Sequence, residues 1–320
     1  MNLITLESDE ISIECDVDRG ADILSFVDKR INLNLLFSTP WRDRADKISA
    51  YKQNTLNFGT FSNWLEGYRG GWQTLCPISG PPRFVSGLEI GFHGEMSLIP
   101  WEVVHQSINQ LELRIELFTI PITVERKLEV IGNCLFQIDT ITNNSAIGIS
   151  FDYSTHPAFS GAFIEGDVSI DCGAEKLFLD PDSYSFIETD ENFSTWPNFV
   201  SKDGEKIDLR KLPRKGHSRV VFGWLQDFKE QWASITNHDL GITCRLTWDS
   251  KLLPYAWLWQ ELEGTSDFPW FQRARVIAFE PSSSQTHSAG AKSTIHLMAN
   301  ETIEVPISLQ LERVRDRMDT

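Results

Sequence analysis

The sequence predicts an all-β protein built as a large antiparallel β-sandwich. Apolar and polar residues alternate with a period of two along several segments, as they do in strands buried on one face. Turn signals separate these segments at intervals of about 8–12 residues, a spacing typical of antiparallel sandwiches and barrels. Convincing helical patterns are scarce. The 320 residues are expected to form one domain, 1–320, because all-β sandwiches often run to about 200–250 residues or more as one unit.

The clearest alternation lies in the second hundred residues. Residues 111–117 place leucine or isoleucine at every second position, with charged residues between them. Gly132 and Asn133 form a turn signal between two further apolar runs. Strands are expected at 11–15, 111–117, 122–130, 135–142, 293–298 and 302–311. Short helical turns are expected near 41–48 and 221–232.

Composition and charge narrow the classes of partner. Hydrophobic residues make up 41% and charged residues 23% of the chain, which is a globular composition. The net charge of −16 argues against nucleic acid and anionic membranes as partners, because both attract basic proteins. No run approaches the ~18 apolar residues of a membrane span, and the amino terminus has no signal-peptide pattern. The five cysteines, widely spaced and odd in number, fit free thiols in a reducing cytoplasm.

Two segments depart from the pattern of short strands and turns. Residues 57–82 and 248–271 are long and rich in aromatic residues, with Trp72 in the first and Trp259 in the second. Aromatic faces pack against the C–H faces of sugars, while polar groups orient the hydroxyls. Each tryptophan could equally belong to the core, so these segments alone leave both interpretations open.

Three titratable residues stand out by their position. His93 lies in a Gly-Phe-His-Gly stretch, whereas His156 and Glu280 each precede a proline at the end of a strand-like run. A carboxylate at the end of a buried strand needs a partner or has a raised pKa. Each residue alone is more often structural than functional, and only their order and local sequence point to chemistry.

Four motifs in order resemble the aldose 1-epimerase (galactose mutarotase-like) family over nearly the whole chain. The first is an opening hairpin with a Gly-Ala pair at 17–26, and the second is the His-Gly motif at 91–94. The most specific is the run from 126 to 159, which ends in His-Pro-Ala-Phe, and the last is the closing segment 255–282 with Phe-Glu-Pro-Ser. The resemblance implies a supersandwich fold and an isomerase that interconverts the α and β anomers of a sugar.

The resemblance also implies catalytic roles. His156 resembles the general acid, Glu280 the general base, and His93 a group that orients the substrate. Anomer exchange suits such a set, because one base must deprotonate the C1 hydroxyl while one acid protonates the ring oxygen. Histidine and glutamate serve near neutral pH, since modest environmental shifts bring both pKa values into range. The reaction needs no cofactor, and the sequence has no His/carboxylate cluster at metal-ligand spacing.

Substrate binding is expected from Arg69, Trp72 and Trp259. Arg69 resembles the family's sugar-binding arginine, and its Arg-Gly-Gly stretch looks more like the hexose-6-phosphate mutarotase branch. That branch usually carries an arginine shortly after its His-Gly motif, where this sequence has Glu-Met-Ser at 95–97. We therefore expect a small, non-phosphorylated sugar as the substrate, with a hexose-6-phosphate mutarotase as an alternative.

Two further alternatives stay open. The same fold could serve a non-catalytic carbohydrate-binding protein, because fold does not determine function. The presence of both His156 and Glu280 favours the enzyme, since a pure binder needs neither a proton donor nor an acceptor. A glycoside hydrolase or lyase is less favoured, because hydrolysis normally uses two carboxylates. Glu261, Glu263 and Asp267 are expected to be solvated loop charges, although each could hydrogen-bond a sugar hydroxyl.

Overall fold

The protein is almost entirely β. Its structure, a computed structural model, describes residues 2–47, 61–180, 193–200, 204–249, 251–285 and 294–313. Strands contain 53% and helices 5% of these residues. The prediction of a large antiparallel β-sandwich is confirmed.

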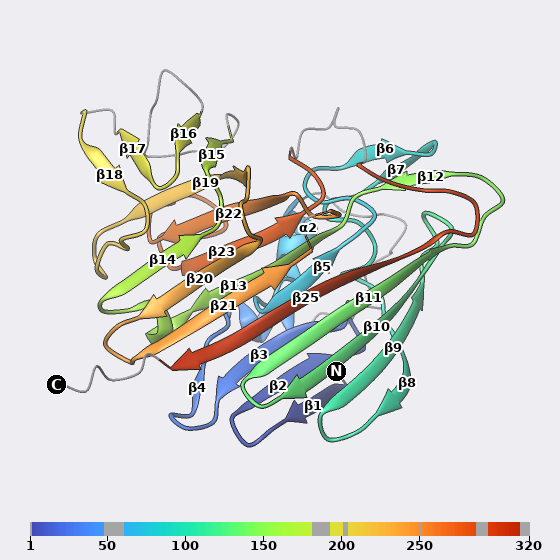
Figure 1. The fold of residues 1–320 in the computed structure, drawn as a ribbon, viewed down its shortest axis with the longest axis horizontal. Coiled ribbons are helices and arrows are strands. Elements are labelled where there is room, and N and C mark those ends of the chain that lie inside the picture. The colour runs from blue at the N-terminus through green and yellow to red at the C-terminus, as the bar shows by residue number, and fades with distance from the viewer. Residues whose placement is uncertain are drawn as a thin grey trace.

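Two large antiparallel sheets stack face to face (Figure 1). The first sheet has eleven strands. In spatial order these are β1 (Leu3–Glu7), β2 (Ile11–Asp16), β3 (Asp22–Asp28) with β4 (Leu33–Asn34) beside it, β5 (Trp72–Leu75), β13 (Ser154–Ser160), β23 (Arg275–Ser282), β22 (Tyr255–Leu262), β19 (Arg219–Gln226), β15 (Lys176–Leu179) and β16 (Phe193–Thr195). The second sheet has eight strands. Their order is β14 (Val168–Cys172), β20 (Trp232–Asn237), β21 (Ile242–Trp248), β25 (Thr302–Arg313), β11 (Cys134–Asn143), β10 (Ile122–Ile131), β9 (Gln110–Glu116) and β8 (Glu102–Gln106).

Smaller elements surround the two sheets. Three two-stranded pairs are β6 (Arg83–Val85) with β7 (Leu88–Ile90), β12 (Ile149–Phe151) with β24 (Ile295–Leu297), and β17 (Asn198–Val200) with β18 (Lys206–Asp208). The helices of the described residues are short: α1 (Arg42–Ala45), α2 (Phe61–Glu66) and a 3-10 turn, Gly161–Ile164. None of them is long and apolar enough to cross a membrane.

The main core lies between the two sheets. In β10, Val124, Leu128 and Val130 are buried while the charged residues between them reach solvent, with the exception of Arg126. Ile13 of the first sheet belongs to the same apolar cluster. This alternation is what a strand with one face on the core requires, and burial of such side chains is the dominant force that holds the sheets together.

A buried ion pair links the sheets next to the central strands. Arg126 on β10 donates from Nε and Nη2 to the two carboxylate oxygens of Asp139 on β11, both at 2.7 Å. Its Nη2 also donates to Thr74 Oγ1 on β5 of the first sheet, at 2.6 Å. The Tyr153 hydroxyl donates to Asp139 at 2.8 Å. The charges are therefore compensated in the core, and β5 is tied to the second sheet.

The expectation of a helical turn at 221–232 is wrong. Residues Val221 and Leu225 are buried on one face of β19, and the aromatic Phe222 and Trp224 lie on the other. Apolar side chains on both faces hide the period of two, so the segment resembles a buried helix. The turn expected at 41–48 is confirmed in part, because α1 covers four residues of it and residue 48 lies outside the described residues. All five cysteines are free and buried.

Candidate active site

The two proposed catalytic residues stand opposite each other on neighbouring central strands. The register of β13 and β23, which pairs Ala158 with Ala278, sets His156 opposite Glu280. On the other side of β13, Gln73 of β5 pairs with His156. Directly opposed residues of antiparallel strands project to the same face of the sheet. Strand pairing alone therefore brings the imidazole and the carboxyl group together.

This face of the first sheet points away from the second sheet. Ile277 and Phe279 of β23 belong to the core cluster between the sheets, whereas Val276 and Ala278 belong to a separate cluster with Trp64 of α2. Glu280 lies on the same face of β23 as Val276 and Ala278, because side chains alternate along a strand. Helix α2 and the loops around it thus cover the outer face, where the candidate site lies.

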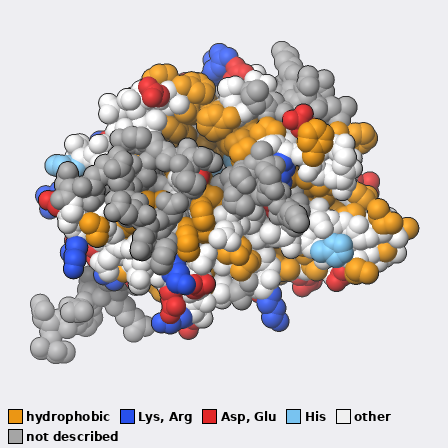
Figure 2. Space-filling view, turned by 90° about the horizontal axis from the view of Figure 1, so that it is seen from above, with side chains coloured by type: hydrophobic (Ala, Val, Ile, Leu, Met, Phe, Trp, Pro, Cys, Tyr) orange, Lys and Arg blue, Asp and Glu red, His pale blue; other side chains and the backbone are white. Residues whose placement is uncertain are grey.

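A cavity of about 560 Å³ occupies this outer face. Four of the six expected site residues line it together: His93, His156, Trp259 and Glu280. Its volume falls within the range of about 300–1,000 Å³ that is typical of small-molecule sites. Seen from above the view of Figure 1, apolar side chains reach the surface of the molecule in several places (Figure 2).

His156 and Glu280 are in direct contact. The Nε2 atom of His156 lies 3.3 Å from Oε1 of Glu280, and the two residues are 7% and 4% exposed. Burial lowers the pKa of His156 to about 4 and raises the pKa of Glu280 well above its usual value. Because burial disfavours both charges, the pair holds a single proton near neutral pH and carries no net charge.

His93 is held by its own loop. The backbone N–H of Gly80 donates to His93 Nδ1 at 2.9 Å, so the ring proton of the neutral imidazole sits on Nε2. Its φ of 64° is in the left-handed region. Gly94 follows at φ +73°, and an added Cβ there would lie 2.5 Å from the carbonyl oxygen of Cys76. The turn therefore needs glycine after the histidine, and it places the His93 side chain in the wall of the cavity.

Aromatic rings form much of the remaining wall. The ring of Trp259 lies 5.7 Å from that of His156, and Tyr68 lies 5.9 Å from it on another side. Trp64 stacks on Tyr68 with centroids 4.8 Å apart. The Tyr68 hydroxyl is buried without a hydrogen-bond partner. A buried hydroxyl with no partner normally indicates a missing water or ligand.

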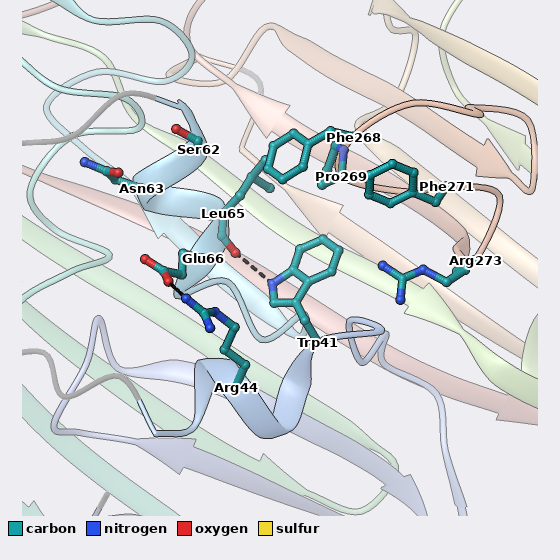
Figure 3. Close-up of a pocket in the computed structure, with 10 residues that line it drawn as sticks. All are labelled: Trp41, Arg44, Ser62, Asn63, Leu65, Glu66, Phe268, Pro269, Phe271 and Arg273. Atoms are coloured by element: carbon teal, nitrogen blue, oxygen red, sulfur yellow. Dashed lines mark hydrogen bonds and ion pairs between the residues drawn. The ribbon is translucent and has the colours of Figure 1, made fainter.

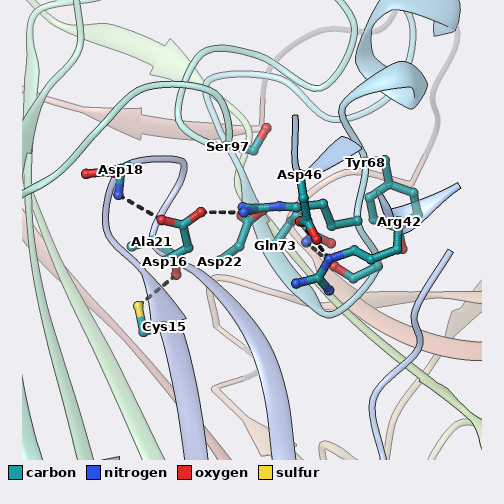
Figure 4. A network of polar contacts seen from close by, with 12 residues as sticks. Cys15, Asp16, Asp18, Ala21, Asp22, Arg42, Asp46, Tyr68, Gln73 and Ser97 are labelled. Atoms are coloured by element: carbon teal, nitrogen blue, oxygen red, sulfur yellow. Dashed lines mark hydrogen bonds and ion pairs between the residues drawn. The ribbon is translucent and has the colours of Figure 1, made fainter. Parts of the chain in front are cut away.

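Arg69 does not line the cavity. Its guanidinium group is 3% exposed and pairs with Asp16, and its Nη2 lies 3.4 Å from Oδ2 of Asp22. Asp16 and Asp22 lie in a network of polar contacts (Figure 4). Gln73 lies in the same group of polar residues. Arg69 is thus placed behind the site, with two carboxylates that already compensate its charge.

The Trp72 side chain lies on the face of β5 that points away from the cavity. It precedes Gln73, which shares a face with His156, so the indole points into the core between the sheets. Its Nε1 donates to the hydroxyl of Thr155, which also faces that core. The indole is 1% exposed and is not among the residues that line the cavity.

Comparison with known proteins identifies the fold. No family model and no curated protein matches the sequence. Solved structures match nearly all of it. The Slr1438 protein from Synechocystis sp. PCC 6803 aligns with a TM-score of 0.69 and 15% identity, covering 98% of this chain and 96% of that chain. A galactose mutarotase related enzyme from Lactobacillus acidophilus aligns with a TM-score of 0.67 and 14% identity, covering 100% of each chain. A galactose mutarotase-like protein from Lactobacillus casei ATCC 334 aligns with a TM-score of 0.64 and 15% identity, covering 97% of this chain and 100% of that chain.

The chain has the galactose mutarotase-like fold. At these identities the similarity establishes the fold alone. Within the described part of the chain, no group of three or more His, Cys, Asp or Glu side chains could hold a metal ion.

Two residues that line this cavity were not predicted as site residues. Asp180 follows β15 directly and lines the cavity. Its Asp-Pro step after an apolar run repeats the pattern at His156 and Glu280, so the sequence did carry a signal for it. Tyr68 lies in the aromatic-rich segment 57–82, and nothing in the sequence indicates that its hydroxyl lacks a partner.

The expectation that Glu261 is a solvated loop charge is wrong. Glu261 is 1% exposed and lines the cavity. Its carboxylate accepts hydrogen bonds from the backbone N–H groups of Gly264, at 2.8 Å, and Thr265, at 3.1 Å. It therefore anchors the loop between β22 and β23, which forms one wall of the cavity.

The charged groups that line the cavity are acidic or titratable. Asp180, Glu261 and Glu280 contribute carboxyl groups, and no lysine or arginine of the described residues lines it. Arg83, like Arg69, is buried and paired, in this case with Asp152. Such a lining favours a neutral, hydroxyl-rich ligand over an anionic one.

Proposed function

We propose that the protein is an aldose 1-epimerase that interconverts the α and β anomers of a non-phosphorylated sugar. The observation that carries this proposal is the contact between His156 and Glu280 in the floor of an aromatic cavity. An imidazole and a carboxyl group that share one proton constitute an acid and a base, and anomer exchange requires both. A protein that only binds sugar would need neither.

The reaction moves two protons and breaks one bond. The base takes the proton of the C1 hydroxyl, the acid gives a proton to the ring oxygen, and the bond between C1 and the ring oxygen breaks to leave the open-chain aldehyde. Rotation about the C1–C2 bond and the reverse transfers close the ring on the other face. The pair regains its original proton distribution, so nothing is consumed.

The family resemblance implies His156 as the acid and Glu280 as the base. Burial favours the neutral pair, in which the proton lies on Glu280. Hydrogen bonds from sugar hydroxyls to a carboxylate stabilise its charged form. Substrate binding is therefore expected to shift the proton from Glu280 to His156, which sets up the roles that ring opening needs.

The other lining residues are proposed to hold the sugar. His93 donates from Nε2 to a sugar oxygen, and the Tyr68 hydroxyl gains in the complex the partner that it lacks without ligand. The faces of Trp259 and Trp64 pack against the apolar C–H faces of the ring. Arg69 and Trp72 support this arrangement from behind and do not contact the substrate.

An exchange survey by NMR tests the proposal. Rates of anomer exchange are measured for free aldoses, such as glucose, galactose and xylose, and for glucose 6-phosphate, each with the wild type and with Glu280→Gln. We expect enzyme-dependent exchange of at least one free aldose that the substitution abolishes. Exchange that is far faster for the phosphate than for every free aldose would instead favour the hexose-6-phosphate alternative. Binding of a sugar without any exchange would favour the non-catalytic binder.

A further inference from the structure

A second cavity opens beside the first. It has a volume of about 390 Å³ and lies between the two short helices and the loop that joins β22 to β23 (Figure 3). Leu65, Phe268 and Pro269 line both cavities. The two spaces are therefore separated by shared side chains and not by a layer of secondary structure.

A row of aromatic rings connects the two cavities. It begins at Trp259, next to His156, and continues to Trp270 with centroids 5.2 Å apart. From Trp270 it reaches Trp41, 5.4 Å further, and Trp41 lines the second cavity. The Trp41 indole is held in place because its Nε1 donates to the carbonyl oxygen of Leu65 at 2.8 Å.

The loop holds two phenylalanine rings at the surface of the second cavity. Phe268 is 57% and Phe271 is 52% exposed, and their ring centroids lie 6.4 Å apart, so the two rings form one exposed apolar surface. Phe271 and Gln272 have φ angles of 46° and 56°. Bulky side chains rarely adopt this conformation, and such strain is found preferentially where a ligand is bound. The backbone N–H groups of Phe271 and Gln272 donate to the carbonyl oxygens of Asp267 and Thr265, and these bonds, with the anchor at Glu261, keep the loop in this shape.

Polar side chains border the phenylalanine rings of the second cavity. Arg44 on α1 pairs with Glu66 on α2 at the rim, and Asn63 and Arg273 also line the cavity. A site that combines aromatic faces with amide, guanidinium and carboxylate tips matches the chemistry of a sugar ring, which has apolar C–H faces and an equatorial belt of hydroxyls.

We propose that the second cavity binds the second ring of a disaccharide or longer reducing saccharide, whose reducing-end ring occupies the first cavity. The inference rests on the proposed function, because it is the position of His156 and Glu280 that requires the reducing end to lie in the first cavity. The non-reducing ring then extends past Trp270 and packs between Trp41 and Phe271.

The test compares glucose with disaccharides that carry glucose at the reducing end: maltose, isomaltose, cellobiose and lactose. Exchange at the reducing end is measured by NMR, and kcat/KM is determined for each sugar. We expect at least one disaccharide to exceed glucose by about tenfold, since one additional packed ring contributes roughly that much to binding. Phe271→Ala should lower the disaccharide-to-glucose ratio by about fivefold. Arg44→Ala, on the opposite wall, should lower it as well and is an independent variant should the first fail to fold.

Phe118→Ala is the matched control. Phe118 is 76% exposed and lines neither cavity, so its removal should leave the ratio at the wild-type value. The inference is overturned if no disaccharide exceeds glucose, or if Phe271→Ala and Phe118→Ala give the same ratio. Methyl glycosides of the disaccharides cannot open at C1 and report binding alone by calorimetry. If no sugar is exchanged, the proposed function fails, whereas tighter binding of these glycosides than of methyl glucoside, lost in Phe271→Ala, still supports the second site.

Discussion

The ring of Tyr68 meets the imidazole of His156 edge-on, with centroids 5.9 Å and planes 79° apart. Its buried hydroxyl has no partner, and burial, with the nearby Glu280, raises its pKa well above the usual value. The hydroxyl therefore stays protonated and can act only as a neutral hydrogen-bonding group. We infer that a sugar oxygen supplies the missing partner.

Tyr68→Phe should weaken substrate binding without loss of stability. A neutral hydrogen bond is worth about 0.5–1.5 kcal/mol, so KM should rise by roughly two- to tenfold. The thermal midpoint should stay equal or increase, because the phenylalanine keeps the stacking with Trp64 and removes an unsatisfied buried group. A lower midpoint with unchanged KM would mean that the hydroxyl is structural.

Glu280→Gln should abolish most exchange in a protein that still folds. Glutamine keeps the shape but cannot accept the proton, and general acid–base groups typically contribute about 10²–10⁴-fold. His156→Gln should cause a similar loss, and the double variant should lose little more than either one, because the two residues act as a unit. Exchange rates are measured with thermal midpoints. Near-normal exchange by a folded Glu280→Gln variant would contradict the assignment of His156 and Glu280 as the general acid and base.

The dependence of kcat/KM on pH should be bell-shaped, because the pair is active with one proton. Below a pH of about 4 the lowered pKa of His156 is passed, both groups are protonated, and no base remains. At high pH the raised pKa of Glu280 is passed, both groups are deprotonated, and no acid remains. Activity should therefore persist well below pH 6.5, the pKa of an ordinary histidine. An acid limb near that value would show that His156 titrates as an exposed imidazole does.

Arg69→Ala should act through stability more than through catalysis. The substitution removes the cation that pairs with Asp16 and lies beside Asp22, and leaves Arg19 as the nearby buried cation. Removal of one partner from a buried ion pair typically costs about 3–5 kcal/mol. The midpoint of chemical unfolding measures this loss. If the variant keeps its stability but loses sugar affinity, Arg69 contacts the substrate as the family resemblance implies.

The strands were predictable where one face meets the core and the other meets solvent. The prediction of a strand at 111–117 is confirmed within one residue at each end. The same reasoning failed at 221–232, because both faces of β19 are apolar or aromatic. The rule for strands thus depends on a solvent-exposed face, which the middle of this sheet lacks.

The two proposed catalytic residues of the candidate site could be predicted from the sequence, but most of the residues that line the rest of the cavity could not. His156 and Glu280 could be found from their order and from the prolines that follow them. Whether Trp72 or its neighbour faces the cavity depends on the register of β5 with β13, which lies more than 80 residues away in the sequence. Burial of Arg69 beside two carboxylates is likewise a long-range outcome that local pattern does not encode.

The cavity obtains its floor and its walls from different kinds of structure. The proton-transfer pair stands on two adjacent central strands, where a shift by one residue would turn both groups into the core. The residues that would contact the rest of the sugar come mainly from α2 and from the loops before β8 and after β22. Loops tolerate insertion and exchange far better than central strands do. New sugar preferences could therefore evolve, or be engineered, by rewriting the 265–273 loop while the reacting groups stay untouched.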